Sequence, residues 1–180
     1  MSWYDIFKFL HVLTAIAWVG GGLVLFVLGI SAQRRNDPAV LAQVASHSAY
    51  LGLRWFVPAS LLTLVFGATA ATLGGLWGDA WVVLGLLGFA GTFLIGLLII
   101  KPTSEEAEKL GAAGKLPEAQ AAGGKILQVS KFDYTLLVLV IADMALKPAW
   151  SDVLTLAVMA VVLVTAGVVF LPTVLRPRAT

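Results

Sequence analysis

The sequence contains no cysteine, and charged residues make up only 12% of its 180 residues. The absence of cysteine excludes a disulfide framework, a thiolate metal site and a cysteine nucleophile. A net charge of only +2, with basic residues scattered between apolar runs, argues against a nucleic-acid-binding surface. The sequence also has no phosphate-binding P-loop, no HExxH zinc motif and no GxSxG elbow. The usual signatures of a soluble enzyme are therefore missing.

Long apolar runs dominate instead, since 59% of the residues are hydrophobic. A helix needs roughly 20 mostly apolar residues to cross a hydrocarbon core of about 30 Å. On this basis we predict five spans in one transmembrane domain over residues 1–180, at 6–30, 56–73, 81–100, 132–150 and 153–175. The first run is too long for a cleaved signal core. The predicted fold class is an all-α polytopic membrane helix bundle.

The two long connections, 31–55 and 101–131, differ in character. Asp37 and Pro38 are typical of a helix N-cap and first turn, so we expect a helix that runs into the second span and bends at Pro58. The second connection is charged and rich in alanine and glycine, which predicts a mobile amphipathic segment.

The basic residues give the orientation of the bundle. Only Lys8 and Lys147 of the twelve lysines and arginines fall on the side of the N-terminus, and the others fall on the side of the C-terminus. Because positive charge gathers in cytoplasmic loops, we predict an external N-terminus, a cytoplasmic C-terminus and cytoplasmic positions for both long connections.

Small residues form a strip along the third predicted span. Gly85, Gly88, Thr92 and Gly96 recur at helical spacing, which lets another helix approach closely. The strip fits either packing inside one chain or a homodimer contact.

His11 lies inside the first apolar run, on one helical face with Ala15, Trp18 and Gly22. A histidine in lipid needs a partner, because an unsatisfied polar group there is costly. Three hypotheses remain open: a hydrogen bond to a neighbouring helix, an axial bond to haem iron, or a proton relay.

A second polar group closes the fourth span. Asp143 and Lys147 are four residues apart and can form an ion pair on one helix face, with Met144 beside them, before Pro148 ends the helix. If the first and fourth spans are neighbours, these residues meet His11 near the outer surface. Together they would suit a non-enzymatic proton- or ion-coupled carrier or an accessory membrane protein.

Three motifs resemble bacterial membrane families. The H-x6-W-x-G pattern of His11, Trp18 and Gly20, and the Lys147-Pro148 pair, are similar to the HemJ-type and CopD-type families. The segment VPASLLTLVFG at 57–67 resembles an allied group of small bacterial integral membrane proteins of unassigned function.

The resemblance implies a bacterial cytoplasmic (inner) membrane, haem b bound through His11, and Trp18 and Lys147 in its pocket. HemJ-type proteins oxidise protoporphyrinogen, but this chain lacks the second histidine-bearing segment expected of them, so haem binding with electron transfer or porphyrin-linked redox is the expectation. Membrane lipid and a quinone or redox partner are the expected contacts. Met144, water or a second protomer would supply the sixth iron ligand.

His47, the second histidine, precedes the second span on the opposite side of the bilayer from His11. A core of about 30 Å keeps one haem from joining both rings within a chain. We expect His47 to be solvated or interfacial, with a second haem site as the alternative.

Overall fold

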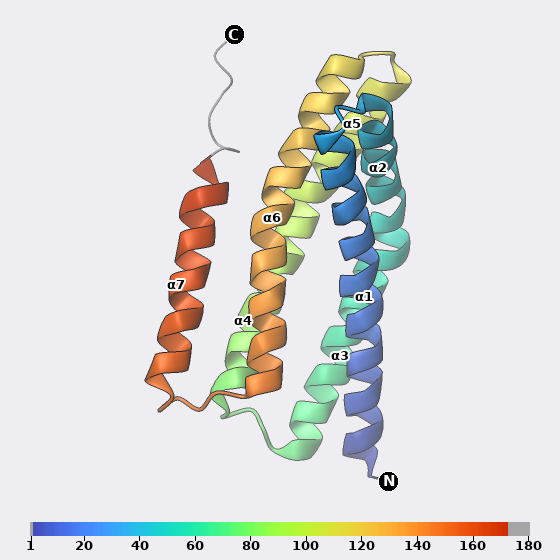
Figure 1. The fold of residues 1–180 in the computed structure, drawn as a ribbon. Helices are drawn as coiled ribbons and strands as arrows, with labels where there is room; N and C mark the ends of the chain where they lie inside the picture. Colours follow the sequence, from blue (N-terminus) through green and yellow to red (C-terminus); the bar gives the residue numbers. More distant parts are fainter. Residues whose placement is uncertain (1, 173–180) are drawn as a thin grey trace.

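The structure, a computed structural model, describes residues 2–172, and the regular elements among them are all helices (Figure 1). In chain order they are α1 (Trp3–Arg34), α2 (Pro38–Leu51), η1 (Gly52–Phe56), α3 (Val57–Gly74), α4 (Ala80–Ile95), η2 (Gly96–Ile100), α5 (Lys101–Ala112), α6 (Leu116–Leu146) and α7 (Val153–Phe170). The prediction of an all-α bundle is confirmed. The helix bundle has an N-terminal end, where α1 begins, and an opposite end, the α5 end, where α5 lies (Figure 1).

Four of the described helical stretches are long and apolar enough to cross a membrane: Trp3–Arg34, Pro38–Gly74, Ala80–Ala112 and Val153–Phe170. The apolar part of α6 is interrupted by Lys131, Asp133 and Asp143, although α6 packs against both α4 and α7. The chain is thus an integral membrane protein with several crossings.

The observed bounds differ from the predicted spans at two places. The helix α6 ends at Leu146 rather than residue 150, because Lys147 adopts the left-handed conformation (φ 50°) and Pro148 cannot continue the helix. Within the last predicted span, α7 ends at Phe170, and residues 173–175 lie outside the described residues.

The start of α2 follows its sequence signals. The Asp37 side chain accepts a hydrogen bond from the backbone N–H of Val40 at 3.1 Å, with Pro38 in the first turn. The helix then continues through η1 into α3, as predicted.

Two π-helical segments interrupt the long helices. Both η1 and η2 begin with Gly-Leu and lead to a proline in the pattern G-L-x-x-x-x-P, at residues 52–58 and 96–102. In each, the N–H of the residue after the segment bonds to the carbonyl of its first glycine, five residues back. Because proline has no N–H, the ordinary α-helical ladder cannot close there.

The segment 101–131 is helical and packed, so the prediction of a mobile segment is wrong. The α5 helix and the first half of α6 form a hairpin that turns at Gly114 (φ 73°) and packs against α2. Ala107 and Ala119 are 1% and 0% exposed, and Leu127 packs in a cluster with Ala32 and Leu41. Small side chains let these helices approach closely, and tertiary packing stabilises a segment whose own pattern is weak.

Candidate functional site

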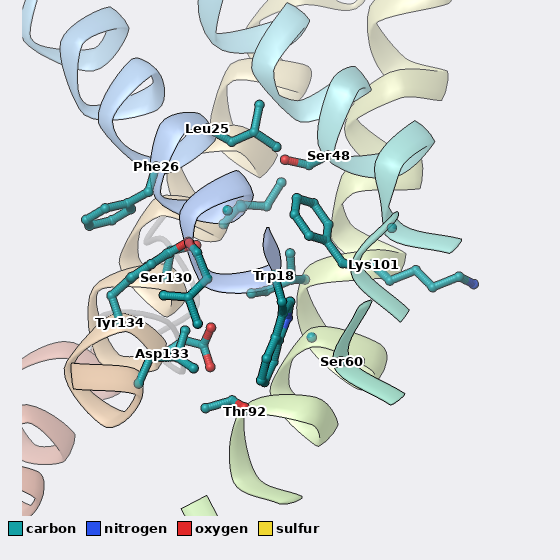
Figure 2. Close-up of a pocket in the computed structure, with 18 of the residues that line it drawn as sticks. Trp18, Leu25, Phe26, Ser48, Ser60, Thr92, Lys101, Ser130, Asp133 and Tyr134 are labelled. Atoms are coloured by element: carbon teal, nitrogen blue, oxygen red, sulfur yellow. The ribbon is translucent and has the colours of Figure 1, made fainter. Parts of the chain in front are cut away.

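A cavity of about 150 Å³ lies among α1, α3, α4 and α6, next to both π-helical segments (Figure 2). Its polar lining consists chiefly of the side chains of Ser60, Thr92, Ser130, Asp133 and Tyr134. Most of the lining is apolar, but by volume the space can hold several water molecules, since one water needs about 10–15 Å³. This cavity is the candidate functional site.

Asp133 supplies the carboxyl group in the cavity wall. Its residue is only 8% exposed, and its Oδ1 atom makes no hydrogen bond to any described residue. In Figure 2 the carboxylate points toward Trp18, with Thr92 close by. An unpaired carboxyl group at such a depth is costly and calls for a function.

Two hydroxyl groups of the cavity lining do not donate to Asp133. Ser60 Oγ donates to the Val57 carbonyl at 2.9 Å, and Thr92 Oγ1 donates to the Phe89 carbonyl at 3.1 Å. These protons therefore satisfy the helices' own backbone. These two hydroxyls therefore present oxygen lone pairs to the cavity, and neither donates to Asp133.

Tyr134 and Trp18 form the aromatic part of the wall. The Tyr134 ring stacks on Phe26 at 4.8 Å, and its hydroxyl makes a long contact of 3.5 Å to the Val19 carbonyl. Gly22 permits this approach, because a Cβ atom there would collide with the Tyr134 hydroxyl. Trp18 packs edge-on against Phe89, with ring centroids 5.6 Å apart.

Lys101, a cationic residue in the cavity lining, does not neutralise Asp133. Its Nζ atom forms an ion pair with Glu105 at 3.1 Å, and its side chain extends away from Asp133 in Figure 2. Among the described residues, nothing in the cavity lining would balance the negative charge of an ionised Asp133.

His11 lies elsewhere, at the contact between α1 and α3. Its Nδ1 atom donates to the Thr63 carbonyl at 2.8 Å, and its ring lies against Gly67. It does not line the cavity. The hydrogen bond to a neighbouring helix, one of the three sequence hypotheses, is present.

The polar group at the end of α6 faces a different helix. Met144 and Asp143 lie against Gly85 of α4, and Lys147 Nζ lies 4.9 Å from the centre of the Trp81 ring. The predicted ion pair between Asp143 and Lys147 does not form, because Lys147 leaves the helix in the left-handed conformation and turns to Trp81.

The predicted haem residues therefore do not gather around one space. Helices α1 and α6 are neighbours, but they meet through Phe26 and Tyr134 in the α5 half, while α3 covers His11. Of the predicted set, only Trp18 borders the cavity. The cavity is also well below the roughly 300 Å³ at which ligand pockets begin. These residues do not fit a haem held between His11 and Met144.

Two further predictions concern His47 and the small-residue strip. His47 is exposed on α2, and its Nδ1 atom donates to the Gln43 carbonyl at 2.7 Å, as expected for a solvated residue. Gly85 and Gly88 are buried against Met144 and Val140 of α6, which confirms packing within the chain for this half of the strip. The homodimer stays a prediction.

Sequence reasoning missed Asp133, Ser130 and Tyr134 as site residues. Asp133 interrupts the fourth predicted span, and no role was predicted for it. Its signal was available, because an acidic residue inside a predicted span is by default a functional candidate.

Comparison with known proteins identifies the family. Residues 5–148 match the model of the family described as "Predicted integral membrane protein (DUF2269)", a stretch that includes α1 to α6 almost completely and leaves out α7. No curated protein and no solved structure matches the chain. The chain belongs to the DUF2269 family of integral membrane proteins.

Proposed function

We propose that this protein is a proton-translocating membrane carrier in which Asp133 takes up and releases the proton. The observation that supports this is the unpaired, buried carboxyl group in a largely apolar cavity within the membrane bundle. Ionisable residues inside membrane bundles typically mark pathways for protons and ions.

The chemistry of the cavity favours a proton. A charged carboxylate in apolar surroundings is unstable unless something neutralises it, and a single proton does so without further ligands. The oxygens of Ser60 and Thr92 keep lone pairs free to accept hydrogen bonds from water, and in this proposal water in the cavity brings protons to Asp133. Among the residues that the structure describes, no group of three His, Cys, Asp or Glu side chains is placed to hold a metal ion.

In this proposal α6 is the fifth span, with the N-terminus outside and the C-terminus in the cytoplasm of a bacterial cell. The basic residues support that orientation, because most of them lie in the connections at the α5 end. The polar residues of α6 are tolerated because Asp133 faces the cavity rather than lipid. The cavity then lies in the cytoplasmic half of the membrane.

The test is proton flux into liposomes that contain the purified protein and a pH-sensitive dye, driven by a potassium gradient with valinomycin. We expect flux from the wild type, at least a tenfold loss in Asp133→Asn, and recovery in Asp133→Glu. Glu118→Gln is the matched control, because it removes an exposed carboxylate from the same helix. Wild-type flux no greater than that of empty liposomes, or an unaffected Asp133→Asn variant, would overturn the proposal.

A reduced-minus-oxidised spectrum of the same sample tests the haem hypothesis. A Soret band that disappears in His11→Ala would replace the carrier proposal with a b-type haem protein. Flux that follows sodium instead of the pH gradient would reassign the transported ion, and so would refute a proton carrier.

A further inference from the structure

Asp143 is the second buried carboxyl group of α6. The residue is 1% exposed, and neither Oδ1 nor Oδ2 makes a hydrogen bond to any described residue. It lies against Gly85, near the Met144 thioether. Asp143 is thus less exposed than Asp133, and both of its carboxyl oxygens, rather than one, are buried without a hydrogen bond. The described residues at the α4–α6 contact provide no group that would stabilise a negative charge on Asp143.

The surroundings of Asp143 select the kind of ligand. A metal cation needs several oxygen ligands, whereas the α4 face against Asp143 presents glycine. The nearby cation of Lys147 is held over the Trp81 ring. A proton is the one ligand that neutralises a carboxylate without additional donors or acceptors.

The position of Asp143 along α6 determines the side of the membrane whose solvent can reach it. It lies three residues from the last residue of α6, a depth of about 5 Å at about 1.5 Å per residue, whereas Asp133 lies about 20 Å from that end. The two carboxyl groups are about 15 Å apart along the helix. Between them, Leu136 and Val140 pack against Gly88 and Gly91 of α4.

This apolar packing keeps the two sites separate. Gly88 leaves no room for a Cβ atom beside Val140, and a Cβ atom at Gly91 would lie 3.0 Å from Leu136. Tight apolar contacts of this kind exclude the water that a direct proton transfer over about 15 Å would need.

We propose that Asp143 is a second proton-binding site, which exchanges its proton with the solvent at the N-terminal end independently of Asp133. It rests on and deepens the proposed carrier, since each side of the membrane would then have its own proton-binding carboxyl group on α6. Binding at Asp143 does not depend on transport and can be measured without it.

The test is labelling by dicyclohexylcarbodiimide, an apolar reagent that adds to protonated carboxyl groups. The full-length protein is labelled in liposomes, and fragment ions between residues 133 and 143 locate the adduct. We expect an adduct at Asp143 in the wild type and in Asp133→Asn, its loss in Asp143→Asn, and none at the exposed residue Asp152. Because the wild type itself is mapped, the result does not depend on the folding of a variant.

Sidedness completes the test. The orientation of the protein in the liposomes is determined by labelling a single cysteine introduced by Ser2→Cys. The wild-type chain has no cysteine, so only this residue reacts with the label. Raising the pH only on the side of the N-terminus should reduce labelling at Asp143 at least fivefold and leave Asp133 unchanged. An unlabelled Asp143, or labelling that follows the pH of the opposite side, would overturn the second site. Wild-type liposomes without proton flux would refute the carrier alone.

Discussion

Replacing Gly67 by alanine tests the structural role of His11 directly. A Cβ atom at residue 67 would lie 2.6 Å from His11 Nδ1 and 2.9 Å from its Cε1, so the ring must move. Moving it breaks the 2.8 Å hydrogen bond to the Thr63 carbonyl. The lost hydrogen bond costs about 0.5–1.5 kcal/mol and overpacking about 1–3 kcal/mol. The higher helix propensity of alanine offsets up to about 1 kcal/mol of this loss in the free energy of unfolding.

We therefore expect Gly67→Ala to destabilise the wild type by about 1–2 kcal/mol and to be neutral or slightly stabilising in a His11→Ala background. The coupling between the two sites is then about 2 kcal/mol, roughly a thirtyfold change in the unfolding equilibrium. Unfolding by SDS in mixed micelles, followed by tryptophan fluorescence, measures it.

Gly20→Ala is the control for this cycle, because a Cβ atom at residue 20 of α1 meets nothing within 4 Å. It should stabilise the protein by up to about 1 kcal/mol, the helix-propensity gain alone. An equal loss from Gly67→Ala with and without the His11 side chain would show that the ring does not occupy this contact, and the reasoning would fail.

Three further predictions address the rest of the bundle. Ser104→Ala should stabilise the protein by about 1 kcal/mol in the same unfolding assay, because it removes a fully buried hydroxyl that has no hydrogen-bond partner among the described residues; a loss of stability would mean that the hydroxyl is satisfied. Ala119→Leu should destabilise it by about 1–3 kcal/mol or more, since residue 119 is 0% exposed between packed helices; tolerance would contradict the packed 101–131 segment. Single cysteines at Asn36 and Ser151 should react with an impermeant maleimide from opposite sides of intact membranes, and reaction from the same side would refute a five-span topology.

The sequence allowed the helices to be predicted because apolar run length and capping residues are local signals. Asp37 and Pro38 start α2 as their chemistry requires. The segment 101–131 was misjudged for the opposite reason. Ala107 and Ala119 are weak local signals, and they order the segment only through burial against other helices.

The neighbours of each helix could not be predicted from the run lengths. His11 was predicted to meet Asp143 and Met144 only if the first and fourth spans were neighbours, and whether His11 contacts α3 or α6 depends on which helix surface allows close approach. Gly67 provides that surface on α3 for His11, and Gly85 provides it on α4 for Met144. Such pairings depend on long-range packing, because a small residue allows close helix contact but does not determine which helix makes it.

The position of the cavity along the helices is indicated in the sequence by the repeated pattern G-L-x-x-x-x-P. Each copy forms a π-helical segment whose residues line the cavity, and each proline deprives the carbonyl four residues before it of a helical donor. A π-helical turn places an extra residue in its turn and disturbs the regular packing of neighbouring helices. Two such turns at the same level explain why a cavity forms there. Asp133 on the opposing α6 lies at that level, so the two motifs and the acidic residue together define one site.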